Sequence, residues 1–350
     1  MLPRDLPMEP RASLADVAAG RASLIGARTR IARRDFGVRA GVISPYETRA
    51  RLGLRYGDPP IEEARYERAR SKARDAGVLV RWALSHLMAW HTPSAAAAKP
   101  ASPIELLSVR IDPLDTIEVI DRIRGWLHER RSATVCFVHA HALNLSARDA
   151  TMREDLQAAD LVLPDGVGVR LGAWMQGRGL PANVNGTDLV PELLLQLAAD
   201  RIPVALIGAA PGVAERAARN WRAKANFELV GVWDGYRSDT EYREAYKEIS
   251  AHRPAVVLLG FGSPLQERHA RSFSVEQDGL VVITVGGLFD FAAHAVPRAP
   301  LAWRELGLEW VWRLAHEPRR LARRYLLGNP EFLARMAMQR MGHTPSAASD

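Results

Sequence analysis

From residue 102 onwards, short apolar runs alternate with segments in which apolar residues recur at helical spacing. The runs are rich in Val, Ile and Leu, which is typical of strands buried on both faces of a sheet. The pattern predicts strands over residues 134–138, 161–163, 203–207, 229–232, 255–259 and 280–285. It predicts helices over residues 116–128, 142–158, 189–199, 213–223, 241–252 and 264–272.

This alternation determines the expected fold class. Parallel strands need long crossover connections, and the intervening helices provide them. We therefore predict a Rossmann-like α/β fold, with a mainly parallel sheet and helices on both faces.

The two ends of the chain have a different pattern. Arg-rich helical segments over residues 14–34 and 61–74 are separated by Pro-containing breaks, and residues 91–100 have the low complexity of a linker. Residues 77–90 are apolar apart from Arg81 and His86, which fits either a helix packed on the main domain or one in a membrane interface. The predicted regions are a helical extension with a linker, an α/β domain, a basic amphipathic helical appendage and a disordered tail, over residues 1–100, 101–302, 303–340 and 341–350.

Composition excludes several classes of protein. With 350 residues, 47% of them hydrophobic and 25% charged, the chain is globular rather than disordered. The single cysteine, Cys136, has no disulfide partner, and no Cys/His cluster has metal-ligand spacing, so we expect a reducing, cytoplasmic compartment and no metal site. No apolar stretch approaches the ~20 residues of a spanning helix, and no signal region is apparent.

The net charge of +7 is unevenly distributed. Lys and Arg exceed Asp and Glu in residues 1–100 and 303–350, whereas residues 101–302 are mildly acidic. Nucleic-acid-binding proteins more often carry basic surface on the folded core. Basic ends therefore favour an anionic membrane surface or a phosphate-bearing ligand, and we expect no nucleic acid partner.

Asp165 is the strongest candidate for chemistry. It follows the run 161–163 directly after Pro164 and precedes Gly166, so it should lie at the carboxyl end of a strand, where open α/β sheets bind ligands. The same position also suits an N-cap of the helix that begins near Val167. Both interpretations remain open from this segment alone.

Three further strand ends carry small residues that open a helix, over residues 207–212, 260–267 and 285–291. Glycine there would let backbone amides approach a phosphate or ribose. Neither a GxGxxG with a following acid nor a P-loop motif is present, which disfavours a dinucleotide. Several such turns in one sheet favour a nucleotide site.

A family resemblance rests on five segments in unbroken order. Residues 159–166 (ADLVLPDG), 186–189 (GTDL), 260–267 (GFGSPLQE), 286–290 (GGLFD) and 306–310 (LGLEW) with 317–321 (EPRRL) closely resemble the WecG/TagA/CpsF glycosyltransferase family. The resemblance covers roughly residues 102–340. It implies an inverting transferase that needs no metal ion or other cofactor. Such an enzyme moves a sugar from a UDP-sugar donor to a polyprenyl-diphosphate-linked sugar acceptor in bacterial exopolysaccharide synthesis.

The resemblance also implies a location and roles for individual residues. The protein would be peripheral on the inner face of the plasma membrane, and a homo-oligomer is left open. Asp165 matches the proposed general base, Gln266 an active-site glutamine and Asp290 a position near the uracil. Arg313, Arg320 and Arg323 match appendage arginines that stabilise the leaving diphosphate, and their spacing puts them on one helical face. The remaining candidate substrate-binding residues are His139, Gly166, Asn183, Gly208, Gly262, Glu267 and Gly287.

Two positions depart from the family pattern. Residues 137–139 (FVH) stand where the family commonly has Thr-x-Asn, and Asn183 stands where it often has arginine. The sugar would then differ from N-acetylmannosamine, with glucose or a uronic acid as candidates. The alternative is a catalytically impaired subunit that binds UDP-sugar or serves as a scaffold in a polysaccharide assembly complex.

The N-terminal extension carries a weaker resemblance. Residues 38–45, 51–56 and 66–84 resemble the C-terminal end of bacterial polyprenyl-phosphate sugar-phosphate transferases. The part of that family that would carry its chemistry has no counterpart here, which implies a remnant or docking arm without activity of its own.

Overall fold

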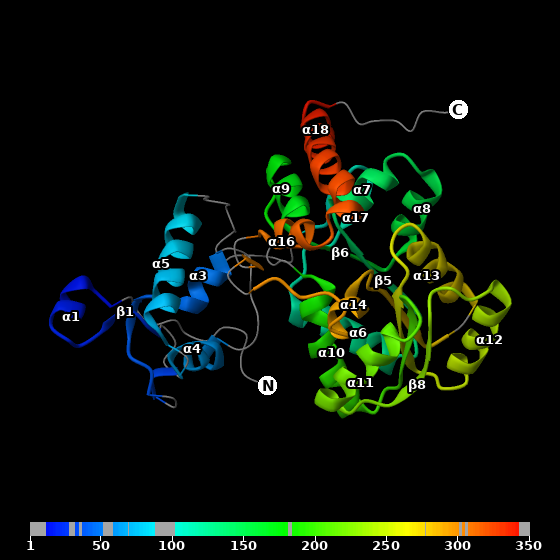
Figure 1. The fold of residues 1–350 in the computed structure, drawn as a ribbon, viewed down its shortest axis with the longest axis horizontal. Coiled ribbons are helices and arrows are strands. Elements are labelled where there is room, and N and C mark those ends of the chain that lie inside the picture. Colours follow the sequence, from blue (N-terminus) through cyan, green and yellow to red (C-terminus); the bar gives the residue numbers. More distant parts are fainter. Residues whose placement is uncertain are drawn as a thin grey trace. The chain divides into compact units, whose positions relative to one another are not determined.

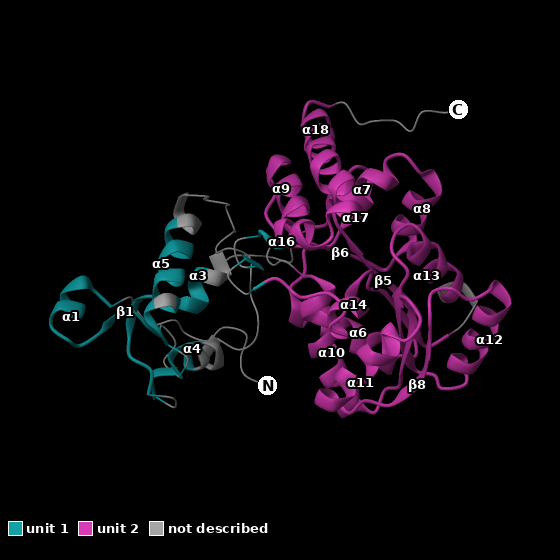
Figure 2. Ribbon diagram, viewed as in Figure 1, with its two compact units in different colours: residues 1–97, 300–309 teal, residues 98–299, 310–350 magenta. Residues whose placement is uncertain are grey.

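A computed structural model describes residues 12–27, 32–34, 37–51, 59–68, 70–87, 102–180, 184–276, 278–300, 303–304 and 307–342. The chain divides into two compact units, shown in Figure 2. Residues 1–97 and 300–309 form the first unit, and residues 98–299 and 310–350 form the second. Most of the segment expected to be a separate appendage, 303–340, thus belongs to the second unit.

The first unit combines short helices with a small pair of parallel strands. The strands β1 (Ser23–Ile25) and β2 (Gly41–Ile43) pair side by side. The helices are α1 (Leu14–Ala18), α3 (Pro45–Arg51), α4 (Pro59–Arg68) and α5 (Lys72–Leu87). The predicted helix over residues 14–34 is wrong, because α1 ends near Gly20, which has φ +70°, and the chain then enters β1.

The apolar segment 77–90 contributes to this unit's own core. Its residues 77–87 belong to α5, where Val78 is buried against Ile25 and Ile43. Residues 88–90 lie outside the described residues. No helix of the described part of the chain is long and apolar enough to span a bilayer.

The second unit is built on a six-stranded parallel sheet with helices on both faces (Figure 1), which confirms the predicted Rossmann-like α/β fold. The strand order is β6-β5-β10-β9-β7-β8. The strands are β5 (Ala133–Val138), β6 (Leu161–Pro164), β7 (Val204–Gly208), β8 (Leu229–Trp233), β9 (Ala255–Gly260) and β10 (Leu280–Thr284). All except the edge strand β8 are buried along their whole length, which explains their continuous apolar runs.

Alternate residues of each strand face two different helical layers. In β5, Val135 and Phe137 belong to one core cluster, whereas Cys136 and Val138 belong to the other. The first layer consists of α6 (Thr116–His128), α10 (Gly186–Asp200), α11 (Val213–Ala225) and α14 (Leu288–Ala292). The second layer consists of α7 (Ala140–Ser146), α8 (Ala150–Ala158), α9 (Val167–Met175), α12 (Asp239–Ser250) and α13 (Leu265–Glu276).

Two local features differ from the sequence prediction. The single helix expected over residues 142–158 is divided, because the Asp149 side chain accepts a hydrogen bond from the Met152 amide and starts a new helix, α8. An antiparallel hairpin of β3 (Ile104–Leu106) and β4 (Val109–Ile111) was not predicted. Its turn places Leu107 and Ser108 at positive φ and lacks the glycine or asparagine that usually marks such turns.

The C-terminal helices belong to the second unit's core. They are α16 (Glu309–His316), α17 (Pro318–Ala322), the π-helical turn η1 (Arg323–Leu327) and α18 (Gly328–Arg340). α18 packs against α9 at Gly172, where a Cβ would lie only 2.8 Å from the Phe332 ring. Phe332 and Met336 are buried in the same cluster as α7 and α8. The close approach of α9 and α18 therefore requires glycine at position 172.

This packing generates the first prediction. We expect Phe332→Ala to lower the free energy of unfolding by about 3–5 kcal/mol, because it removes a buried aromatic ring and leaves a cavity. Chemical denaturation followed by circular dichroism measures the change. The control is Leu327→Ala, five residues away, whose side chain is 65% exposed and whose loss should cost no more than about 0.5 kcal/mol. Equal effects of the two substitutions would contradict the packing role of Phe332.

Candidate functional site

The carboxyl ends of β5 and β6 bring His139 and Asp165 to neighbouring positions. Val138 and Pro164 are register partners in the two strands, and the Asp165 amide donates a hydrogen bond to the Val138 carbonyl at 2.8 Å. The residues that follow these two strands, His139 and Asp165, therefore lie at the same edge of the sheet. Sequence reasoning placed both residues at strand ends, and the strand pairing brings them together.

The helix after Asp165 has glycine, not aspartate, at its N-cap. Gly166 occupies that position of α9 with φ +85°, and no side chain caps the helix there. A Cβ on Gly166 would meet no atom within 4 Å, so the space beside it is open. The interpretation of Asp165 as the N-cap residue is therefore wrong.

The adjacent strands β5 and β10 send the chain to opposite faces of the sheet. β5 leads to α7 in the second layer, and β10 leads to α14 in the first. In open α/β sheets, a crevice forms where neighbouring strands diverge in this way. His139 and Gly287 follow these two strands, so they border the expected crevice.

Gln266 ties two strand-end loops together. Its Oε1 accepts hydrogen bonds from the amides of Gly262 at 3.2 Å and Gly286 at 3.0 Å. Gly262 has φ +81° and open space where a Cβ would point, so glycine is needed there for the turn. The predicted site residues Gln266 and Gly262 thus form one structure at the ends of β9 and β10.

Glu267 lies beneath this loop structure rather than in the open crevice. It is 1% exposed, and its Oε1 accepts hydrogen bonds from Ser263 at 2.8 Å and Gln266 at 2.9 Å. Its Oε2 is buried and has no hydrogen-bond partner. Burial raises the pKa of Glu267, against the lowering effect of the two hydrogen bonds. The geometry gives Glu267 a supporting role for Gln266.

Gly208 is required by strand packing. It has φ +131°, and a Cβ there would lie 2.5 Å from the backbone of Gly260 on the neighbouring strand β9. Nothing in this geometry gives Gly208 a separate role in binding.

Arg313 and Asp290 border one small space at the end of β10. A Cβ built on Gly287 would lie 3.5 Å from Asp290 Oδ2 and 3.9 Å from Arg313 Nη2. The Arg313 guanidinium lies over the Phe291 ring, 5.2 Å from its centroid. The Nε atom of Arg313 is buried and has no hydrogen-bond partner. A donor without a partner at a glycine-lined strand end suits an anionic oxygen.

Arg320 joins this group through Glu317. Its Nη2 lies 2.7 Å from a carboxylate oxygen of Glu317, which is also 4.0 Å from Arg313. Burial raises the pKa of Asp290, and the neighbouring Arg320 opposes that shift. Arg313 and Arg320 therefore both pair with Glu317, but they belong to two helices, α16 and α17, so they do not lie on one continuous helical face as their spacing predicted.

The third arginine near the crevice is Arg324, not the predicted Arg323. Arg323 is exposed, whereas Arg324 is partly buried with an Nε atom that has no hydrogen-bond partner. Burial lowers the pKa of Arg324, and the carboxylate of Asp165 acts in the opposite direction. Helical spacing from Arg320 fits residues 323 and 324 about equally, and both residues open the π-helical turn η1, so only the structure shows which one is less exposed.

A family model now adds to this geometry. The glycosyl transferase WecG/TagA/CpsF family model matches residues 104–346, well over half of the chain. The chain belongs to this family. Members are glycosyltransferases of cell-surface polysaccharide synthesis, and the matched range contains the whole sheet and the arginine-bearing helices.

In this WecG/TagA/CpsF family member, His139 has a fixed role in its helix. Its Nδ1 accepts a hydrogen bond from the Ala142 amide at 2.9 Å and so caps α7. Burial lowers the pKa of His139 well below its usual range, and Arg324 adds to that effect. The imidazole is therefore neutral, with its proton on Nε2, which can donate but not accept.

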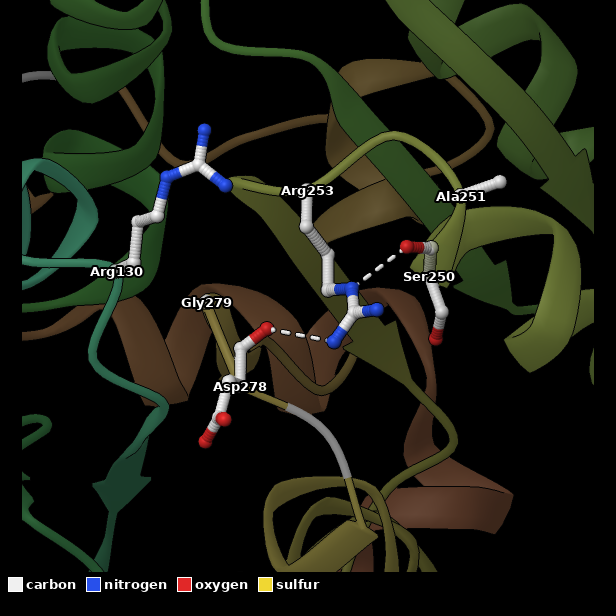
Figure 3. Close-up of a pocket in the computed structure, with 6 residues that line it drawn as sticks. All are labelled: Arg130, Ser250, Ala251, Arg253, Asp278 and Gly279. Carbon is white, nitrogen blue, oxygen red and sulfur yellow. Dashed lines mark hydrogen bonds between the residues drawn. The ribbon is translucent and has the colours of Figure 1, made fainter.

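A hollow of about 270 Å³ lies at the opposite edge of the sheet (Figure 3). Arg130, Ser250, Ala251, Arg253, Asp278 and Gly279 line it, from loops that precede β5, β9 and β10. The Arg253 guanidinium already makes two hydrogen bonds within the protein there, because it donates to the carbonyls of Ser250 at 2.6 Å and Asp278 at 3.2 Å. We place the candidate site of this glycosyltransferase at the carboxyl edge, where the family motifs converge.

Asn183, which was predicted to bind substrate, lies outside the described residues. Within the described part of the chain, no cluster of three or more His, Cys, Asp or Glu side chains could hold a metal ion.

The buried carboxyl of Glu267 generates the second prediction. Its pKa is raised in the folded state, so the folded protein retains a proton that the unfolded chain releases above about pH 4.3. Its contribution to stability is therefore lost as pH rises through the folded-state pKa. We expect Glu267→Gln to reduce the decline in unfolding free energy with rising pH, measured by denaturation at several pH values.

The control for this measurement is Glu154→Gln, whose side chain is 65% exposed. It should retain the pH dependence of the unsubstituted protein. An unchanged slope in Glu267→Gln would show that this carboxyl does not titrate on unfolding.

Proposed function

We propose that the protein is an inverting glycosyltransferase that moves a sugar from a UDP-sugar to a polyprenyl-diphosphate-linked sugar. Family membership supports sugar transfer in general, and the site geometry supports the more specific reaction. The observation that carries the proposal is the convergence of one carboxylate, Asp165, with the partly buried side chains of Arg313 and Arg324, each with a buried Nε atom that has no hydrogen-bond partner.

The proposed reaction is a single displacement. The Asp165 carboxylate accepts the proton of the acceptor hydroxyl, whose oxygen attacks the anomeric carbon of the donor. The bond from that carbon to the UDP oxygen breaks, and UDP leaves with the electron pair. Attack opposite the leaving group inverts the anomeric configuration.

Other groups would stabilise the charge that develops on the leaving diphosphate. Arg313 lies beside Gly287 at the amino end of α14, and Arg320 interacts electrostatically with Asp290 of the same helix. Charge-assisted hydrogen bonds from guanidinium groups suit diphosphate oxygens. The proposed mechanism therefore uses no metal ion, and transfer should persist in the presence of EDTA.

The lipid-linked acceptor requires the protein to work at a membrane surface. Leu326 and Leu327 on η1 are 58% and 65% exposed and lie beside the exposed Arg323. Exposed apolar side chains next to basic ones favour binding to anionic lipid. We therefore propose peripheral binding to the inner face of the plasma membrane through η1.

A panel assay tests the proposed function. Purified protein is incubated with individual UDP-sugars and a polyprenyl-diphosphate-linked sugar, with and without EDTA. Transfer from a UDP-sugar to the acceptor supports the proposed enzymatic activity. A strict requirement for a divalent metal would contradict the proposed mechanism. Thermal stabilisation by UDP without turnover of any donor would favour the alternative of a catalytically impaired binding subunit.

The third prediction concerns the base itself. We expect Asp165→Asn to lower the rate of transfer by roughly 10²–10⁴, because the amide keeps the shape of the side chain but cannot accept the proton. UDP affinity, measured by titration calorimetry, should remain within about twofold. Near-normal turnover of this variant would exclude Asp165 as the general base.

The fourth prediction concerns the membrane. We expect the double substitution Leu326→Ser/Leu327→Ser to weaken co-sedimentation with anionic liposomes, because it removes two exposed apolar side chains. Met341→Ser is the control, since that side chain is equally exposed at 68% but lies at the far end of α18. Unchanged liposome binding would show that a different surface of the protein contacts the membrane.

A further inference from the structure

Resting on the proposed function, we infer that Arg324 and His139 form a second anion-binding subsite beside Asp165, distinct from the position of the donor's diphosphate at Arg313. The ligand chemistry is an oxygen-bearing anion, either a carboxylate on the transferred sugar or the diphosphate of the acceptor. The inference begins with how η1 and α18 lie against α7.

Two side-chain contacts set the alignment of these segments. Asn144 Nδ2 donates to the Gly328 carbonyl at 2.7 Å, and Arg148 pairs with Glu331 at 2.5 Å. From the first pair to the second, the sequence advances four residues, past the end of α7 at Ser146, and three residues along α18, so the two segments run side by side in the same direction. One turn back, Arg324 lies opposite the amino end of α7, where His139 is.

Independent observations agree with this alignment. The positive charge of Arg324 lowers the pKa of His139 and also that of His141, which burial brings to about 4. Arg324 also interacts electrostatically with Asp165 at the end of β6. Arg324, His139 and Asp165 therefore come together from three different elements.

The subsite is separated from the position that Arg313 occupies. Arg313 borders Gly287 at the end of β10, whereas Asp165 follows β6, two strands away in the sheet order. Two strand spacings correspond to about 10 Å. Arg324 acts on His139 more strongly than Arg313 does, which agrees with this separation. A diphosphate held at Arg313 would thus leave the Arg324 side of the crevice for another group.

The available donors define what that group is. Arg324 has only donors, and its Nε is buried without a hydrogen-bond partner. His139 uses Nδ1 to cap α7, which leaves Nε2–H as a donor. A ligand that meets both must accept hydrogen bonds, and the charge of Arg324 favours an anion over a hydroxyl.

The test uses the full-length protein with Arg324→Gln, Arg313→Gln and, as a charge-matched control, Arg319→Gln on the exposed side of α17. Titration calorimetry measures Kd for UDP, UDP-glucose and UDP-glucuronate. A fourth titration adds a polyprenyl-diphosphate-linked sugar in detergent to UDP-saturated protein. We expect Arg324→Gln to change UDP affinity by less than about twofold, whereas Arg313→Gln weakens it by about tenfold or more.

Two outcomes support the subsite and identify its ligand. Tighter binding of UDP-glucuronate than of UDP-glucose, lost by about tenfold or more in Arg324→Gln, identifies a sugar carboxylate. If Arg324→Gln instead weakens binding of the lipid-linked acceptor alone, by about tenfold or more, the ligand is the acceptor diphosphate. In either case Arg319→Gln should resemble the unsubstituted protein.

Other outcomes overturn the inference. If Arg324→Gln weakens UDP binding as strongly as Arg313→Gln does, both arginines belong to one diphosphate site. If Arg324→Gln matches Arg319→Gln with every probe, Arg324 binds no anion. Absence of binding of UDP and both UDP-sugars to the unsubstituted protein would contradict the proposed function instead. Inorganic diphosphate would then test the subsite, and its affinity must fall in Arg324→Gln but not in Arg319→Gln.

Discussion

The close packing of α18 on α9 is the contact on which the candidate site depends. Gly172 lets the Phe332 ring approach the α9 backbone to a distance that any Cβ would block. With α18 held there, its amino end contacts α7 through Asn144 and Gly328. The preceding turn, η1, is thereby fixed, and Arg324 faces the strand ends. A hydrophobic contact about one turn into α18 thus determines where a cation lies.

Fixing cations in a partly buried crevice has an electrostatic cost that the structure balances locally. Arg313, Arg320 and Arg324 repel one another, and this repulsion together with burial lowers the pKa of Arg324. Asp165, Asp290 and Glu317 supply nearby negative charge. The charges of these side chains therefore partly offset one another. An anionic substrate meets donors that are already oriented, so little reorganisation is needed on binding.

Most of the fold could be predicted from sequence because buried parallel strands have an unambiguous signal. The runs at 134–138 and 255–259 appear as β5 and β9 with shifts of no more than one residue. The positions of Asp165 and Gln266 close to strand ends were predictable, because a short motif marks each one. The lower exposure of Arg324 was not predictable, because helical spacing from Arg320 fits Arg323 and Arg324 about equally. The N-cap role of His139 was equally hidden, since histidine is an uncommon cap.

The two side chains at the ends of β5 and β6 are suited to different tasks. His139 could compete with Asp165 for the proton of an acceptor hydroxyl only if it had a free acceptor nitrogen. Its Nδ1 is occupied by the Ala142 amide, and its Nε2 carries the proton. Accepting a proton would require His139 to become a cation beside Arg324, which the lowered pKa opposes. The cap of α7 therefore leaves His139 as a donor, and the role of proton acceptor at this sheet edge falls to Asp165.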